Sequence, residues 1–156
     1  MPDVVQPEGW AFPRGYANGM VAAAGKIVAI AGQTGVDRDG QLVSKDFLKQ
    51  FEQALDNVVT VVRAAGGSAE DIISMTVYLI DRLQYLASTQ ELGVAWRLRA
   101  GHHFPAMTVV EVKGFVDAQA LVEIQALAVL PPAAAAATTP PAAAGSATTP
   151  PAPVSR

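Results

Sequence analysis

Glu123 is the residue of this chain best placed by its surroundings to carry chemistry. It lies in an apolar segment that predicts a strand from Leu121 to Leu130. Strand alternation puts Glu123 on one face with Gln125, and Ile124 on the other. A carboxylate on a partly apolar sheet face can be held in a cleft, where it moves a proton or activates a water molecule. The alternative is an ordinary glutamate exposed to solvent on an open sheet, and composition leaves both interpretations open.

The two histidines of the chain, His102 and His103, are adjacent. In extended chain, neighbouring side chains point in opposite directions, so one metal ion cannot easily bind both. The chain has no cysteine, which excludes disulfides, thiolate metal sites and a cysteine nucleophile. We therefore predict neither a metal nor another cofactor. One histidine is expected on the surface and the other near a subunit or loop contact.

Charge and motifs exclude several classes of partner. The P-loop pattern is absent, as is a G-x-G-x-x-G between a strand and a helix. The net charge is −3, from 11 Lys and Arg against 14 Asp and Glu, whereas nucleic-acid binders need a basic face. The first residues lack the basic and apolar regions of a secretory signal. The apolar run 126–137 is interrupted by prolines and is shorter than the roughly 20 residues that span a bilayer. We expect a cytoplasmic protein that binds neither nucleic acid nor membrane.

A change of composition near Leu130 divides the chain. Pro131 and Pro132 end the last predicted strand, because proline lacks the N–H that a strand ladder needs. Residues 131–156 contain 10 Ala, 7 Pro and 4 Thr, and cannot bury enough apolar surface to offset the entropy lost on ordering. We predict one domain over residues 1–130 and a disordered tail over 131–156. The tail is either a neutral solubilising extension or a docking segment for a proline-recognising partner.

The first half of the predicted domain contains two short strands and a helix. Apolar runs at 20–24 and 26–31 predict a β-hairpin. Apolar residues recur at helical spacing over 45–65, which predicts a helix with one apolar face. Ser44 is its expected N-cap, and Gly66 is the expected C-terminal stop.

Three strands are predicted in the second half of the domain. Ser68 and Asp71 have the spacing of a capping box and precede a predicted buried strand over 72–80. Two further apolar runs, at 107–112 and 121–130, predict the last two strands.

A second helix is predicted from Asp81, as its cap, to about Arg99. Glycine inside a helix costs about 1 kcal/mol relative to alanine, so we expect something to pack closely at Gly93. The predicted inner side of this helix also carries Leu86, Leu92 and Trp96. The resulting order is β-β-α-β-α-β-β, an α+β fold in which two helices cover one face of a single mixed sheet.

Seven segments, in order and together, resemble the RidA/YjgF (reactive intermediate deaminase) family. They are Tyr16, Ala31-Gly32-Gln33, Gln53-Ala54-Leu55-Asp56-Asn57-Val58, Ala64-Ala65-Gly66-Gly67, Thr76-Val77-Tyr78-Leu79-Ile80-Asp81, Phe104-Pro105-Ala106 and Val122-Glu123-Ile124-Gln125-Ala126. Each segment is weak alone. In register they cover essentially the whole predicted domain and none of the tail.

This resemblance implies a chorismate-mutase-like fold and a homotrimer whose sheets pack into a barrel, with clefts at the subunit interfaces. It also implies hydrolysis of imines and enamines formed from amino acids, which releases a keto acid and ammonia. By resemblance, Glu123 positions or activates the water, and Tyr16 and Gly32 line the cleft. A cleft position that is often Asn on the second helix falls on Gln90, counting back from Phe104.

The sequence departs from the family at Met107. The family's Phe-Pro-Ala-Arg is Phe-Pro-Ala-Met here, and that arginine clamps the substrate carboxylate in the archetypal enzymes, a bidentate pairing that methionine cannot make. Methionine makes this end of the cleft apolar and adaptable. Val109 is a further expected cleft residue that differs from the usual lining. The sequence leaves open whether Arg14, Arg97 or a histidine supplies a cation instead.

Two functions follow from these residues. The first is hydrolytic deamination of a small imine-like or enamine-like metabolite, with Glu123 handling the water. Because Met107 replaces the arginine, the expected substrate is not a standard 2-imino acid. The alternative is a non-catalytic trimer that binds a small molecule in the same cleft, as a binding or regulatory protein. Ribonuclease activity, sometimes attached to this family's name, is disfavoured by the acidic charge.

Overall fold

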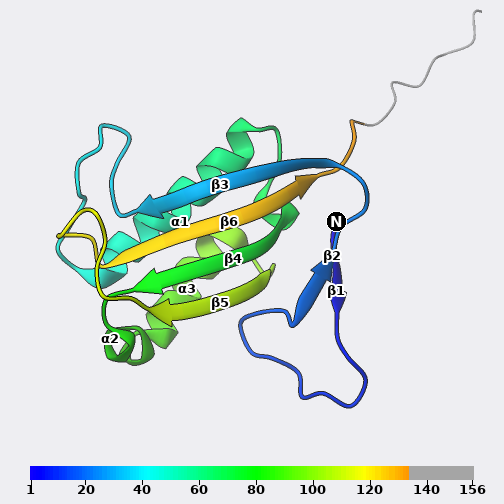
Figure 1. Ribbon diagram of the computed structural model, residues 1–156, viewed down its shortest axis with the longest axis horizontal. Helices are drawn as coiled ribbons and strands as arrows, with labels where there is room; N and C mark the ends of the chain where they lie inside the picture. The colour runs from blue at the N-terminus through cyan, green and yellow to red at the C-terminus, as the bar shows by residue number, and fades with distance from the viewer. Residues whose placement is uncertain (134–156) are drawn as a thin grey trace, which may run out of the picture.

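A mixed four-stranded sheet forms the centre of the molecule in the computed structural model, which describes residues 1–133 (Figure 1). The strand order is β3-β6-β4-β5, in which β6 is antiparallel to both its neighbours and β4 is parallel to β5. The bounds of these strands are Lys26–Thr34 for β3, Ile72–Leu79 for β4, Ala106–Glu111 for β5 and Val122–Leu130 for β6. The predicted tail lies outside the described residues from residue 134 onward.

The helices lie on one face of this sheet, and the other face is uncovered (Figure 1). Their bounds are Phe47–Ala64 for α1, Arg82–Ala87 for α2 and Thr89–Ala100 for α3, with a short 3-10 turn at Ala69–Asp71. The predicted α+β class, with a mixed sheet and helices on one side, is confirmed. Among residues 1–133, no helix combines the length and apolar character needed to cross a bilayer.

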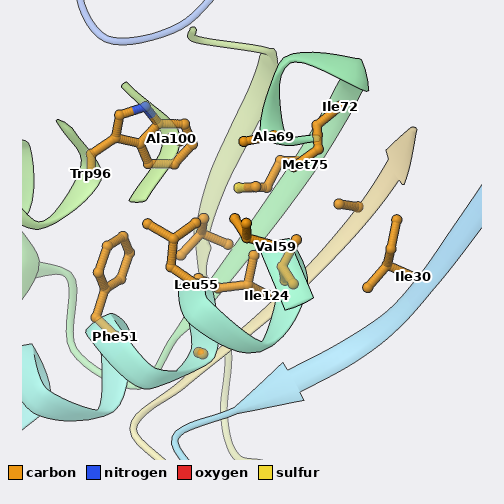
Figure 2. Close-up of a cluster of buried hydrophobic side chains, with 14 of the residues drawn as sticks. Ile30, Phe51, Leu55, Val59, Ala69, Ile72, Met75, Trp96, Ala100 and Ile124 are labelled. Atoms are coloured by element: carbon orange, nitrogen blue, oxygen red, sulfur yellow. The ribbon is translucent and has the colours of Figure 1, made fainter. Parts of the chain in front are cut away.

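The hydrophobic core lies between α1, α3 and the sheet. Figure 2 shows Phe51, Leu55 and Val59 of α1 packed towards Ile124 of β6 and Met75 of β4. The alternation predicted for the last strand is confirmed, because its helix-side residues are buried and those between them are more exposed. The buried set is Val122, Ile124, Ala126, Ala128 and Leu130.

Several predicted boundaries are confirmed by local geometry. Gly66 and Gly101 follow the ends of α1 and α3 with φ of 93° and 62°, a conformation that L residues other than glycine rarely adopt. The capping box before β4 forms as predicted, since Asp71 Oδ2 accepts the Ser68 N–H at 2.8 Å. Asp81 caps α2 through its side chain, which accepts from Leu83 N at 2.8 Å.

The predicted hairpin over residues 20–31 is wrong. Strand β2 (Gly19–Val21) pairs instead with β1 (Asp3–Val5) in a separate two-stranded sheet, while β3 pairs only with β6. Three-residue strands carry almost no register signal, so the sequence could not show which partner the residues near Met20 would choose. The segment is also held elsewhere, because the Ala17 N–H donates to Pro105 O at 2.9 Å.

The predicted helices differ from the structure in two details. The N-cap of α1 is Asp46 rather than Ser44, with Asp46 Oδ1 accepting from Lys49 N at 3.0 Å. Both residue types make good caps, so spacing alone did not separate them. The second predicted helix is interrupted at Ser88 and becomes α2 and α3. The prediction that Leu86 faces inward is wrong, since Leu86 is 57% exposed. No residue of α2 is buried.

Removing residues 131–156 is expected to leave the domain intact. The last strand ends at Leu130, which is 5% exposed and part of the core. A chain ending at Leu130 or Pro132 should therefore keep the melting temperature within about 2 °C, as surface changes do, and should keep the oligomeric state of the full chain in light scattering. A chain ending at residue 121, which lacks β6, is the control expected not to fold. An unfolded product from the longer truncation would contradict the domain boundary.

Candidate functional site

The carboxylate of Glu123 lies directly against the backbone of β3. The register of β3 on β6 shifts between Ile30 and Gln33, so Ala31 and Gly32 form a bulge beside Glu123. A Cβ atom added to Gly32 would overlap Glu123 Oε1 and would lie 2.6 Å from Cδ and 2.9 Å from Cγ. Bulges re-aim the chain next to functional groups, and here only glycine lets the carboxylate approach this closely.

The face that carries Glu123 is the one that no helix covers. Glu123 is half-buried and lies opposite Tyr78 of β4, while Gln125 lies opposite Thr76. Leu127, two residues further along the strand, is 43% exposed. The sequence therefore placed Glu123 on the correct face, and the structure adds Gly32 as its neighbour.

A pocket of about 240 Å³ lies on the opposite side, where β5 meets α3 and the N-terminal segment. Met107 and Val109 of β5 pair in register with Met75 and Val77 of β4, whose side chains are buried under the helices. Both residues consequently face the helix side at the edge of the sheet. The pocket is also lined by Tyr16, so three of the predicted binding residues meet here.

The N-terminal segment is fixed to the pocket by its backbone. Ala17, which is buried, bridges to Ala106 at the start of β5 and donates to Pro105 O at 2.9 Å. Gly15 has a φ of 78°, in the region that favours glycine. This turn and the bridge hold Tyr16 at the pocket, although it lies far from Met107 in sequence.

Aromatic side chains form one wall of the pocket. The rings of Trp96 and Phe104 stack with centroids 5.6 Å apart and an angle of 11° between planes. Trp96 Nε1 donates to His103 O at 2.9 Å, and a ring nitrogen of His103 lies 2.7 Å from Ile72 O. His103 thus belongs to a loop contact and His102 is exposed, as predicted. Among residues 1–133, no three His, Asp or Glu side chains converge to hold a metal ion.

Glu123 and Met107 do not meet within one chain. The resemblance predicts a cleft at a subunit interface that brings Tyr16, Gly32, Glu123 and Met107 together, so these residues need not meet within one chain. The structure forms two separate groups, with Gly32 and Glu123 on the open face and Met107 in the pocket. Their separation follows from the registers on β4, where Met107 pairs with Met75 and Glu123 with Tyr78. Met75 and Tyr78 are an odd number of positions apart, so the two-residue period of a strand puts them on opposite faces.

Helix α3 places Thr89 at the pocket, whereas Gln90 is exposed and does not line it. Consecutive helix residues are about 100° apart around the axis, so counting back from Phe104 across the break at Ser88 can miss the pocket by one position. A signal for the missed residues was present. Tyr85, Thr89, Gly93 and Trp96 line the pocket at helical spacing.

Two features of this wall bear on binding. Burial raises the pKa of Tyr85 above its ordinary value. A tyrosine hydroxyl is protonated at neutral pH even without such a shift, so it can donate a hydrogen bond to a ligand. Sequence reasoning expected close packing at Gly93, but a Cβ there would meet nothing within 4 Å. That glycine therefore leaves open space in the pocket rather than filling a tight contact.

Replacing Gly32 with alanine is expected to move the Glu123 carboxylate while keeping the fold. The added methyl group forces Glu123 out of its rotamer, which costs about 1 kcal/mol of stability. Misplacement of a reacting group by about 1 Å costs on the order of 100-fold in rate, so any turnover that uses the Glu123 carboxylate should fall by about that factor. In a Glu123→Gln background the same substitution should add no further loss. If Gly32→Ala lowers turnover equally in the wild-type and the Glu123→Gln proteins, Gly32 does not act through the carboxylate of Glu123.

Comparisons with known proteins point to one family. Residues 12–130 match the family model described as "Endoribonuclease L-PSP". A RutC family protein from Pyrococcus horikoshii is 36% identical over 106 residues, covering 67% of this chain and 80% of that protein. A 2-iminobutanoate/2-iminopropanoate deaminase from Salmonella typhimurium is 34% identical over 105 residues, with the same coverage of 67% and 80%.

Solved structures agree with the sequence comparison. The chain is similar to a protein of the Rid family from Yersinia pestis, YyfB, with a TM-score of 0.72 and 27% identity over 83% of this chain and 98% of that one. It is also similar to TdcF from E. coli, solved with bound serine, with a TM-score of 0.60 and 26% identity over 83% and 99% of the two chains.

Proposed function

The chain belongs to the RidA/YjgF family, and from this premise we propose that it is a hydrolytic deaminase of a small imine or enamine. The observation that carries the proposal is the contact of the Glu123 carboxylate with the bulge at Gly32. A carboxylate held against the backbone at a partly apolar site is positioned to accept a proton from a water molecule. Relatives about one-third identical include 2-iminobutanoate/2-iminopropanoate deaminases, which supports this reaction class.

In the proposed reaction, Glu123 accepts a proton from water as the water oxygen attacks the imine carbon. The C=N double bond becomes a single bond, and the nitrogen takes up a proton from solvent to give a carbinolamine. Glu123 then returns its proton to the nitrogen, the C–N bond breaks to release ammonia, and the hydroxyl loses its proton to solvent as the carbonyl forms. The products are a ketone or keto acid and ammonia, and the carboxylate is regenerated.

The complete site is proposed to form between two copies of the chain. Glu123 and Gly32 lie on the open face, and the pocket with Met107 lies on the helix side, so one chain cannot present both groups to one substrate. The open face also carries apolar side chains that a partner would cover; Ile27, Val110 and Leu127 are 72%, 38% and 43% exposed. The resemblance implies a homotrimer, which light scattering of the full chain should reveal. A clean monomer would contradict a shared site.

The substrate is proposed to differ from the short 2-imino acids. The lining of the pocket around Met107 is largely apolar, and position 107 offers no bidentate partner for a carboxylate. A hydrogen bond to a charged group contributes about 1.5–3 kcal/mol, so its loss corresponds to about 10- to 100-fold in rate. We therefore expect kcat/KM for 2-iminopropanoate to be lower by that factor than for a relative that keeps the arginine.

The experiment that tests the function compares two imines made in situ by an amino-acid oxidase, one from alanine and one from leucine. The rate at which the protein removes each imine is measured with and without Glu123→Gln. We expect measurable hydrolysis of the larger, more apolar imine, weak hydrolysis of 2-iminopropanoate, and no hydrolysis of either by the variant. Hydrolysis that survives Glu123→Gln would contradict the proposed role of this residue.

A non-catalytic binding protein is the second candidate, and Met107 is the observation that favours it. Replacement of the clamp by an apolar residue also suits a protein that retains the pocket but not the turnover. In that case Glu123→Gln alters ligand affinity only, and no imine is consumed.

Ribonuclease activity, which the description of the family model mentions, is disfavoured by the net charge of −3.

A further inference from the structure

Arg14 is the one charged side chain among the residues that line the pocket. Its residue is exposed, whereas Phe51, Leu92 and Trp96 on the same lining are buried in the core. Arg14 therefore lies at the solvent side of the pocket, and the buried apolar residues form its floor. A ligand that fills the space meets a positive charge at one end and an apolar surface at the other.

The position of Arg14 follows from the backbone around it. The bridge from Ala17 to Ala106 fixes the segment three residues away, and the turn at Gly15 lies between Arg14 and Tyr16. Arg14 is thus attached to the same anchored segment as Tyr16. The ion pairs of the described chain use Arg38, Lys49 and Arg99, so Arg14 is not drawn away by an acidic neighbour there.

We propose that Arg14 binds an anionic group of the ligand at the mouth of the pocket, and that the ligand is an amphipathic anion whose apolar part lies against Met107 and Val109. Guanidinium pairs with carboxylate through two parallel hydrogen bonds. Together with the proposed function, on which this step rests, the substrate class becomes carboxylate-bearing imines with an apolar side chain. The positive charge that binds the carboxylate is then supplied by the N-terminal segment instead of by position 107 on β5.

This arrangement selects differently from an arginine at position 107. A clamp on β5 would place the carboxylate beside Val109 and Val77, inside the pocket. With Met107 there, that space accepts a hydrocarbon chain, and the carboxylate is left at the solvent-facing end. Apolar side chains of the ligand gain about 25 cal/mol for each Å² removed from water, so larger apolar ligands should bind better than short ones.

Calorimetric titration of the full chain with 4-methyl-2-oxopentanoate and with its carboxamide tests the proposal. The two probes differ by one charge and share the same apolar group. The wild-type protein is expected to bind the acid about 10-fold tighter than the amide, a modest preference because exposed charges are screened. Arg14→Gln should lower the affinity for the acid to that for the amide, while the affinity for the amide stays the same. Arg14→Lys should keep part of the preference for the acid.

Arg97→Gln is the matched control, because Arg97 is an exposed arginine of α3 that does not line the pocket; it should leave both affinities unchanged. An acid preference that survives Arg14→Gln, or failure of the wild type to bind either probe, would overturn the proposal. Glu123→Gln separates it from the proposed function: that variant should keep the acid preference and lose turnover. If the wild-type protein hydrolyses no imine but Arg14→Gln still removes its preference for the acid, the anion site is supported and the proposed deaminase activity is contradicted.

Discussion

Replacing Glu123 with glutamine is expected to lower kcat for imine hydrolysis by about 100- to 10,000-fold, the usual contribution of a positioned acid–base group. Glutamine has nearly the same shape but cannot accept and return the proton of the attacking water. The effect should appear in kcat with little change in KM, since the missing interaction belongs to the transition state. The measurement is steady-state hydrolysis of the leucine-derived imine, with melting temperature as a check on folding.

Gln125→Ala is the matched control for this prediction. Gln125 lies two residues away on the same strand and the same face, and it is exposed. Its truncation should leave both kcat and stability nearly unchanged. A similar loss in both variants would mean that the open face acts through assembly rather than through the carboxylate of Glu123.

Replacing Met107 with arginine is expected to raise kcat/KM for 2-iminopropanoate by about 10- to 100-fold. The substitution supplies a charged bidentate partner on β5, at a position where the chain now has none, with a value of about 1.5–3 kcal/mol for the hydrogen bonds to a charged group. Met107 is half-buried against the core, so the new charge is partly desolvated. Some loss of stability is expected when no anion occupies the pocket, and a carboxylate ligand should restore it.

The double variant Met107→Arg with Glu123→Ala separates binding from catalysis. If Glu123 handles the water, this variant should lose the activity gained from arginine while still binding a carboxylate ligand. Val109, the other pocket residue expected to differ from the usual lining, is the same in both variants, so the comparison isolates Glu123. A folded Met107→Arg protein that binds a carboxylate yet hydrolyses no imine would favour the non-catalytic binding protein.

Local patterns predicted most of the fold. The alternation of Val122 and Ile124 with Glu123 identified the buried and open faces of β6, because strand period and burial are properties of a few consecutive residues. The capping box at Ser68 and the glycine after α1 were likewise readable from neighbours in sequence. These features need no knowledge of distant segments.

Features that depend on distant partners were not predictable in the same way. The pairing of β1 with β2, in place of a hairpin around Gly25, results from competition among short strands. The second predicted helix breaks at Ser88, whose backbone has φ of −106° and ψ of 13°, and the six residues of α2 before it include no buried residue. The same limit applies to the site, where the registers of β5 and β6 on β4 are both needed to show that Met107 and Glu123 face opposite ways.

Residue types identified part of the candidate site. The carboxylate of Glu123 and the small residue at Gly32 were each visible in sequence, but their contact depends on the bulge between two strands. The helical spacing of Tyr85, Thr89 and Gly93 was visible in the sequence, but counting back from Phe104 selects Gln90, one position beyond Thr89. Arg14 could be placed at the pocket only by the bridge between Ala17 and Ala106.

The most direct test of a site shared between two copies is complementation of two inactive variants. Glu123→Gln removes the acid–base group and leaves the pocket intact. Gly93→Phe blocks the pocket, because the new side chain starts where nothing lies within 4 Å of the Cβ, and leaves Glu123 intact.

The two variants are mixed, refolded together and assayed for imine hydrolysis, with mass spectrometry confirming mixed oligomers. In a random mixture, about a quarter of the interfaces join an intact pocket to an intact Glu123, so about a quarter of the wild-type activity should return. Mixed oligomers that remain as inactive as either parent would contradict a site built from two copies.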